Sequence, residues 1–301
     1  MTASHDSTND PRIRRGHVAM LGATFLISTS FPIGAAITSD LDSLVLTFMR
    51  FALAALLFMP FIIWRYGWHI PSLRDFLRYA VLSACLVAFF WGMFVALRTT
   101  SALNTAVIFT ITPLITALVS TLLFKTTPGM TTRMALLIGM GGAIWVIFRG
   151  ELDALLSLRL NVGDGIFFAA TIAMGFYGPL VKRLHRGEPM AQMTFWTLVT
   201  GAAWLLALAA PQFSSVQWAD VSASVYLGIV YLAIFTTLIT FFIVQWCTTV
   251  IGPTKVISYT YLNPIWVVFM AMALGKASPP ITTYPGFALI VAAIYLLQRE
   301  P

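Results

Sequence analysis

Long apolar runs, separated by short polar connections, fill almost the whole chain. Ten of the runs are long enough to cross a bilayer, since about 20 apolar residues in a helix span its ~30 Å hydrocarbon core. The runs are continuous and do not alternate apolar with polar positions, which argues against the strands of a β-barrel. The pattern predicts an all-α integral membrane protein with ten transmembrane helices, at residues 17–37, 43–63, 77–97, 101–124, 131–148, 162–183, 190–210, 221–246, 253–274 and 283–298.

The composition indicates lipid rather than water as the surrounding medium. Of the 301 residues, 59% are hydrophobic and 10% are charged, whereas soluble domains are about 45–50% apolar and about 25% charged. The basic residues are scattered through short connections and form no stripe, so the net charge of +7 does not indicate a nucleic-acid partner. We expect the partners to be membrane lipid and a small-molecule solute.

The sequence carries no motif for binding a metal or a nucleotide cofactor. The two cysteines, Cys85 and Cys247, are too few for a disulfide framework or a four-ligand metal site. No phosphate-binding G-x-x-x-x-G-K-[ST] loop occurs; the nearest fragment, 275–277, lacks both the first glycine and the Ser/Thr. We therefore expect no metal, no cofactor, no enzyme activity and no ATP-driven pumping by this chain alone.

The basic residues also predict the orientation. The tail at residues 1–16 is polar, and the apolar run after it is long enough to span, so we interpret that run as an uncleaved first helix. If the N-terminus is cytoplasmic, thirteen Lys and Arg residues face the cytoplasm and four face outside, namely Arg98, Arg149, Arg159 and Lys276. Positive charge concentrates on the cytoplasmic side, so both termini are predicted to lie there.

The chain also repeats itself. A shift of 151 residues places Pro113, Leu123, Lys125, Pro128, Thr131 and Thr132 on Pro264, Leu274, Lys276, Pro279, Thr282 and Thr283, and a shift of 147 places Gly16 and Pro32 on Gly163 and Pro179. Five spans are an odd number, so the second copy enters the membrane upside down, as in many secondary transporters. The predicted organisation is a tail at 1–16, one five-helix repeat at 17–149, a periplasmic linker at 150–161 and an inverted five-helix repeat at 162–299.

Three stretches carry a family resemblance: TFMRFALAALL at 47–57, LRTTSALNTAVIFTITPLITALVSTLLF at 97–124 and its echo TTVIGPTKVISYTYLNPIWVVFMAMALG at 248–275. With the five-plus-five helices, they resemble the EamA-type branch of the drug/metabolite transporter superfamily, and within it the YddG-type exporters of aromatic and other amino acids. The resemblance implies a monomeric secondary transporter in the bacterial inner membrane. Many relatives carry Glu just after helices 4 and 9 where this chain has Lys125 and Lys276, so no role of that Glu can be transferred.

Among the prolines inside predicted helices are Pro32, Pro113, Pro179 and Pro264, which the two shifts pair between the repeats. Proline removes a helix hydrogen bond and crowds the preceding turn, and in lipid such a break persists only where neighbouring helices or a cavity satisfy the backbone. The four prolines are expected to be either hinges around a central path or static bends that shape packing.

Aromatic and polar side chains in the same helices predict a central substrate cavity. Rings would hold an aromatic or aliphatic side chain and polar groups an amino-acid head. The candidates are Thr24, Ser28, Phe90, Trp91, Phe94, Asn104, Phe176, Tyr177, Phe242, Gln245, Tyr259 and Asn263. Asn104, Gln245 and Asn263 are the strongest polar candidates, because Ser and Thr can also bond to their own helix.

Arg50 is the one formal charge well inside a predicted span. It could hold a substrate carboxylate. It could instead be a packing charge whose side chain reaches outward, toward Asp40 or Asp42. We favour the second interpretation, because long basic side chains near a helix end usually reach the interface.

The function predicted from the sequence is export of amino acids, or of similar small amphipathic metabolites, by alternating access. None of the eleven acidic residues lies in the middle of a span, so transport is expected to be facilitated rather than proton-coupled. A multidrug or other metabolite exporter on the same scaffold is the alternative, a channel ranks lower, and a lipid-modifying membrane enzyme is distant.

Overall fold

Ten long apolar helices dominate the computed structural model, which describes residues 10–37, 41–275 and 278–299. Throughout these ranges the regular secondary structure is helical, so the predicted all-α membrane fold is confirmed. The tail before residue 10 lies outside the described residues, and so do Asp40 and Lys276. The spans are Pro11–Gly34, Ser43–Tyr66, Leu73–Ala96, Ala102–Phe124, Met130–Ile147, Val162–Leu184, Met190–Phe213, Ala223–Val250, Pro253–Ala273 and Ile281–Gln298.

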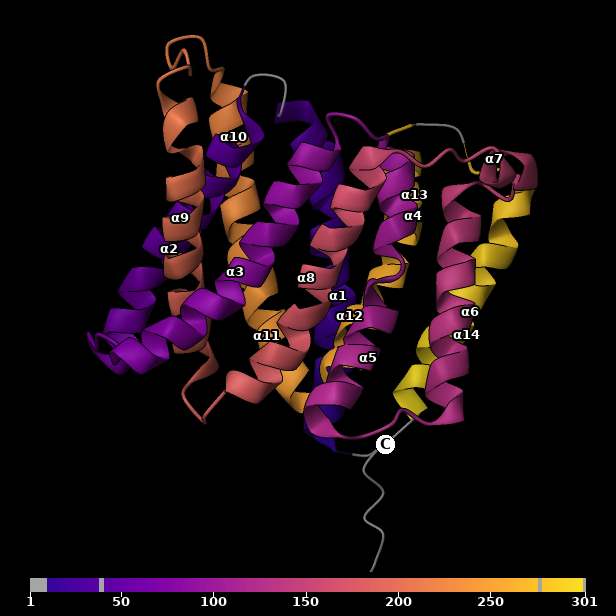
Figure 1. Cartoon of the computed structure of the whole chain (residues 1–301), viewed down its shortest axis with the longest axis horizontal. Coiled ribbons are helices and arrows are strands. Elements are labelled where there is room, and N and C mark those ends of the chain that lie inside the picture. Colours follow the sequence, from indigo (N-terminus) through magenta and orange to yellow (C-terminus); the bar gives the residue numbers. More distant parts are fainter. Residues whose placement is uncertain (1–9, 38–40, 276–277, 300–301) are drawn as a thin grey trace, which may run out of the picture.

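Six spans are single helices: α1 (Pro11–Ile37), α2 (Ser43–Tyr66), α3 (Leu73–Ala96), α6 (Met130–Ile147), α8 (Val162–Leu184) and α9 (Met190–Phe213). Span 4 is divided into α4 (Ala102–Phe109) and α5 (Thr112–Phe124). Span 8 is α10 (Ala223–Ala233), the π-helix η2 (Ile234–Ile239) and α11 (Thr240–Val250). Span 9 is α12 (Pro253–Ser258), the 3₁₀-helix η3 (Tyr259–Leu262) and α13 (Asn263–Ala273), and span 10 is η4 (Ile281–Thr283) with α14 (Tyr284–Arg299). A short helix, α7 (Leu152–Leu156), caps one end of the bundle (Figure 1).

Helices from the two halves of the chain pack against each other throughout the bundle. In Figure 1, α2 lies beside α9, α3 beside α8 and α6 beside α14. Span 3 packs on span 6 as span 8 packs on span 1, and span 4 packs on span 6 as span 9 packs on span 1. These contacts therefore recur when the spans involved are exchanged for the spans five places away in the chain.

Small residues permit the closest of these approaches. A Cβ on Gly92 of α3 would come within 2.6 Å of the Ala170 Cβ of α8. A Cβ on Gly142 of α6 would lie 3.0 Å from the Gly286 carbonyl of α14, and one on Gly286 would lie 2.9 Å from the Gly142 carbonyl. Without a hydrophobic driving force between helices in lipid, such backbone contact is a main source of association.

Two of the four prolines begin helix segments. Pro113 lies in the first turn of α5, directly after the break at residues 110–111, and Pro264 lies in the first turn of α13, directly after η3. Proline fits a first helical turn because its missing N–H would have no partner there. Pro32 and Pro179 lie inside α1 and α8, which continue through them.

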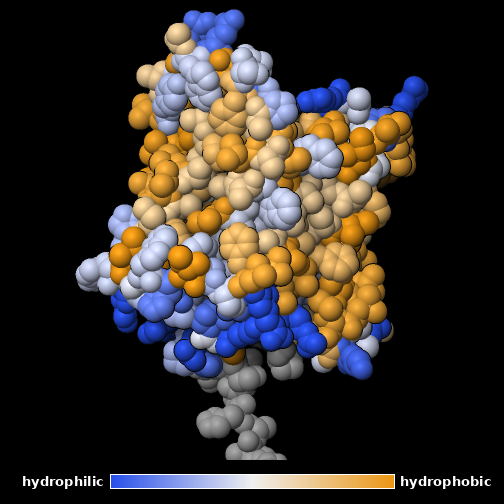
Figure 2. All heavy atoms as spheres, turned by 60° about the vertical axis from the view of Figure 1, so that its left-hand side comes forward, coloured by the Kyte–Doolittle hydropathy of each residue, from blue (hydrophilic) through white to orange (hydrophobic). Residues whose placement is uncertain are grey.

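The outer surface of the bundle is apolar over most of its length. Large side chains such as Trp64, Leu122 and Leu227 are exposed. Figure 2 shows apolar residues covering the middle of one face, while the hydrophilic residues gather toward its two ends. This is the surface of a multi-pass membrane protein, in which lipid replaces the water that a soluble fold would face.

Candidate functional site

A cavity of about 1340 Å³ lies among spans 1–6 and 8–9, with Gln212 near the end of span 7 and the start of span 10 also in its lining. Its lining on α3 runs from Leu86 to the end of the helix, and its lining on α6 is confined to the second half, from Ala143. The cavity thus occupies one half of the bundle. It reaches the surface where Asp42, Arg98 and Arg149 lie, which we call the open end; the opposite end, at Asp75, Arg78 and Glu188, we call the closed end.

Aromatic rings form much of the wall. Phe89 lies 5.3 Å from Phe109 and 5.8 Å from Phe167 between ring centroids, which joins spans 3, 4 and 6. Phe90 packs edge-on against the buried Phe51, and Trp91 and Phe94 complete the stripe on α3. Aromatic walls with few polar groups suit amphipathic solutes of moderate size.

Of the charged residues in the described lining, Arg50 of α2 lies deepest in this wall. Its Nε donates to Thr237 Oγ1, and its NH2 donates to the Thr236 carbonyl at 2.9 Å. The guanidinium carbon lies 5.5 Å from the centre of the Phe90 ring. Asp42 is one of the two acids toward which the side chain was predicted to reach, and Asp40, the other, lies outside the described residues. Asp42 instead accepts hydrogen bonds from the backbone N–H groups of Leu44 and Val45 as the N-cap of α2. The guanidinium therefore turns to span 8 instead of following its own helix outward.

The partners of Arg50 come from the π-helix η2. A π-turn adds a residue to the helix and frees backbone groups locally, and such turns are frequent at functional sites. Thr236, Thr237 and Thr240 are nearly fully buried, and Thr236 and Thr240 belong to the lining of the cavity. They were not among the predicted residues. The run TTLIT at 236–240, with three threonines in an apolar span, was the available signal.

The floor of the cavity is joined to a buried polar network. Tyr177 lines the cavity, and its hydroxyl accepts a hydrogen bond from Gln245 Nε2 at 3.0 Å. The Gln245 carboxamide also accepts from Thr194 at 2.6 Å and donates to Thr197 at 3.3 Å. Gln245 is fully buried below the floor, so its side chain joins spans 6, 7 and 8 and does not face the cavity.

Of the twelve predicted cavity residues, five line the wall: Phe90, Trp91, Phe94, Tyr177 and Asn263. Arg50 and Pro264 also line it. Asn263 accepts a hydrogen bond from Ser28 Oγ at 3.2 Å, behind the wall.

Three predicted polar residues, besides Gln245, serve packing instead. Thr24 and Ser28 are fully buried in the contact of α1 with α13, where each hydroxyl donates to a backbone carbonyl of its own helix. Tyr259 bonds to His17 Nδ1 and Gln298 Nε2, each at 2.8 Å. Hydroxyl donors that find a carbonyl four residues back need no cavity to satisfy them.

Asn104 also lies outside the cavity wall. Asn104 is buried beside the wall, where its Nδ2 donates to Asp164 Oδ2 at 3.0 Å and to the Arg159 carbonyl at 3.1 Å. The Asp164 carboxylate also accepts from Thr100 and from the Asn161 N–H, and so ties span 4 to the start of α8.

Phe176 and Phe242 point to the exposed surface, at 39% and 36% exposure. Sequence pattern named helices 1, 3, 4, 6, 8 and 9, all of which contribute to the lining, but it did not name the wall formed by spans 2 and 5 or the side of each helix that faces the cavity.

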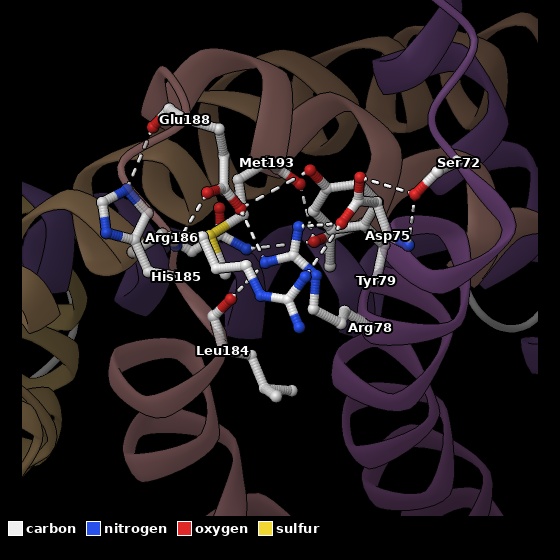
Figure 3. A network of polar contacts seen from close by, with 11 residues as sticks. Ser72, Asp75, Arg78, Tyr79, Leu184, His185, Arg186, Glu188 and Met193 are labelled. Atoms are coloured by element: carbon white, nitrogen blue, oxygen red, sulfur yellow. Dashed lines mark hydrogen bonds and ion pairs between the residues drawn. The ribbon is translucent and has the colours of Figure 1, made fainter.

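The closed end carries a network of charged groups (Figure 3). Arg78 of α3 pairs with Asp75 and, at 3.4 Å, with Glu188, and it donates to the Leu184 carbonyl at the end of α8. Glu188 also accepts from the Arg186 N–H at 2.7 Å. The network fastens α3 to the connection between α8 and α9.

No metal-binding group appears in the ranges 10–37, 41–275 and 278–299: no three His, Cys, Asp or Glu side chains gather there in an arrangement that could hold an ion.

Comparison with known proteins gives the family. The model of the EamA-like transporter family matches residues 14–148 and 161–299. The chain belongs to the EamA-like transporter family. Transport is therefore its class of function, and the ten apolar helices are its membrane spans.

Chains similar to this one occur in bacteria and archaea. The uncharacterized transporter YyaM of Bacillus subtilis is 25% identical, over 83% of this chain and 82% of that protein. An uncharacterized transporter of Archaeoglobus fulgidus is 22% identical, over 87% and 89% of the two chains, and one of Synechocystis is 24% identical, over 98% and 93%. A solved crystal structure that is 18% identical superposes with a TM-score of 0.72 over 94% of this chain and 97% of its own, which shows a shared fold.

Proposed function

We propose that this EamA-like transporter exports amino acids, aromatic and other neutral ones, or similar small amphipathic metabolites, by alternating access. The observation that carries the proposal is the cavity: about 1340 Å³, walled by aromatic rings, with Arg50, Asn263 and several threonines among its lining residues. An amino acid combines an apolar side chain with a polar head, and this wall offers partners for both.

Alternating access is supported by two features. The cavity reaches the surface at the open end and stops at Tyr177 and the Gln245 network, so one face of the membrane has access. The contacts that recur on exchange of spans five apart, and the two stretches matched by the family model, support an inverted repeat at 17–149 and 162–299. Exchange of the packing between two such halves would move access to the other face.

Spans 4 and 9 are the proposed moving elements. Both are interrupted directly before a proline, Pro113 or Pro264, and a broken helix can change direction without breaking a continuous run of hydrogen bonds. Pro32 and Pro179 would contribute smaller bends within α1 and α8. The alternative for all four, static bends, predicts that Pro→Ala changes leave turnover unaltered.

We further propose a monomer in the bacterial inner membrane with both termini in the cytoplasm, and facilitated transport down the solute gradient. The open end would then face the periplasm. The one acid among the described lining residues is Asp42, which caps α2 near the mouth, so the described wall has no carboxylate in its depth for proton coupling.

A counterflow screen of amino acids tests the proposal, with the purified chain in proteoliposomes and no other component. Saturable counterflow of aromatic and neutral amino acids is the expected result. Flux of bulky cationic drugs that free amino acids do not inhibit would favour a multidrug exporter instead. Uphill accumulation driven by a pH gradient alone would contradict facilitated transport.

A further inference from the structure

We propose that Arg50 binds a carboxylate group of the solute and makes the cavity selective for molecules that carry one. The inference deepens the proposed function, on which it rests in treating the cavity as the place where solute binds. It requires no particular solute beyond an apolar body with a carboxylate.

The position of Arg50 fits this role. It lies in the wall between the mouth and the floor, and the other charged residues among the described lining, Arg98, Arg149 and Asp42, lie at the mouth. Asp42 precedes Arg50 by eight residues, which is about 12 Å along a helix, and its carboxylate already caps α2. The described lining therefore has a positive balance, with one cation in its depth.

The hydrogen bonds of Arg50 leave donors for a ligand. A guanidinium has five N–H groups. One donates to Thr237 Oγ1 and one to the Thr236 carbonyl, which leaves three N–H groups without a hydrogen bond in the described part of the chain. Both partners are neutral, and Arg50 forms no ion pair within the described ranges. A cation held at membrane depth without an anion is costly, and an incoming carboxylate can take two of the free donors side by side.

The guanidinium is also held in place before a ligand arrives. Phe90 supports it at 5.5 Å, and that ring is itself fixed by Phe51 at 6.0 Å and Phe89 at 5.5 Å. Thr236 and Thr237, buried in the π-turn, fix the other side. A planar donor that is positioned in advance loses little entropy when it binds. The surrounding rings favour a carboxylate on an apolar body over a fully polar anion such as phosphate.

Two probes that differ in one group test the assignment. Phenylacetate and phenylacetamide share the ring, and only the first carries a carboxylate. Binding to the full chain in detergent is measured by microscale thermophoresis. We expect phenylacetate to bind roughly 10- to 100-fold more tightly, the range of a charge-assisted hydrogen-bonded pair.

Variants of Arg50 decide whether that preference comes from this residue. Arg50→Gln should bring the two affinities within about threefold, and Arg50→Lys should retain part of the preference because it keeps the charge but loses the planar fork. Arg65→Gln is the matched control: Arg65 lies on the same helix, is exposed, and also stacks on a ring, that of Tyr66, at 5.4 Å, but does not line the cavity. It should keep the wild-type preference.

Folding is checked by size-exclusion chromatography and melting temperature. If Arg50→Gln does not fold, Thr237→Val answers the question: it keeps the charge but removes the partner that holds Nε in place, so the preference should fall about threefold. Equal wild-type affinities for the two probes, or a preference that survives Arg50→Gln, would overturn the assignment. Selective phenylacetate binding without amino-acid counterflow would support the role of Arg50 and reject amino acids as solutes. Amino-acid counterflow that Arg50→Gln does not change would support amino acids as solutes and reject the role of Arg50.

Discussion

Arg50 and Arg78 lie on neighbouring helices, and each has an aromatic ring 5.5 Å from its guanidinium carbon, Phe90 in the first case and Tyr79 in the second. Their polar partners differ. Arg78, at the closed end, pairs with the carboxylates of Asp75 and Glu188. Arg50, in the cavity wall, has two neutral oxygen partners.

This difference separates a charge that holds the fold together from a charge that is available to a ligand. Two carboxylates neutralise the Arg78 guanidinium and a backbone carbonyl accepts a further hydrogen bond from it, so an added anion would gain little there. Arg50 retains both its positive charge and part of its donors. The role of an arginine in or near a membrane span therefore follows from the groups that it bonds to, and its depth in the membrane alone does not decide that role.

Removal of Arg78 should have the largest effect on stability. Arg78→Ala leaves Asp75 and Glu188 without their shared cation, and we expect a loss of roughly 2–3 kcal/mol, below the ~3–5 kcal/mol of a fully buried pair because Asp75 reaches water. The melting temperature in detergent measures it. The control, Arg186→Ala, removes a side chain that is 45% exposed and should change stability little. An altered preference between phenylacetate and phenylacetamide in a folded Arg78→Ala protein would contradict the separation of roles.

Truncation of the cavity wall should have the next largest effect. Trp91→Ala removes a large ring next to Phe90, and we expect about tenfold weaker binding of both probes, since the apolar contact is common to them. Counterflow of aromatic amino acids should fall in parallel. Unchanged binding and flux would show that the exposed Trp91 ring makes no contact with the solute.

Removal of each stacking ring in turn tests the comparison of Arg50 with Arg78 directly. Phe90→Leu removes the ring over Arg50 and should lower the carboxylate preference about threefold, the order of a partly desolvated cation–π contact. Tyr79→Leu removes the ring over Arg78 and should leave that preference unchanged. Both are read by microscale thermophoresis, and equal effects of the two changes would count against the comparison.

The mouth should show the smallest effect. Arg98→Gln removes an exposed cation at the open end, and we expect at most a twofold decrease in phenylacetate affinity, because exposed charges are screened over ~8–10 Å at physiological salt. That decrease should disappear as salt is raised, while the Arg50-dependent preference persists. A loss as large as that of Arg50→Gln would move the carboxylate site from Arg50 to the mouth.

Part of the cavity wall could be predicted from the sequence. The stripe Phe90, Trp91 and Phe94 was predicted from local composition and lines the cavity, as does Tyr177. Gln245 and Asn104 were equally reasonable as polar residues in apolar spans, yet one bonds to Tyr177 and Thr194 and the other to Asp164. Their partners lie between 51 and 68 residues away along the chain, so local pattern could not assign them.

The sequence by itself determined the class of protein and its ten spans, because a helix in lipid must satisfy its own backbone and cover about 30 Å with apolar side chains, a condition that every span meets locally. It also indicated where spans 4 and 9 are interrupted, since proline acts on its own turn. Only the tertiary structure decided which polar groups face the cavity. That choice depends on which helix packs beside each residue, and for Arg50 it was the π-turn of a span 186 residues further along the chain, rather than the nearby Asp42, that supplied the partners.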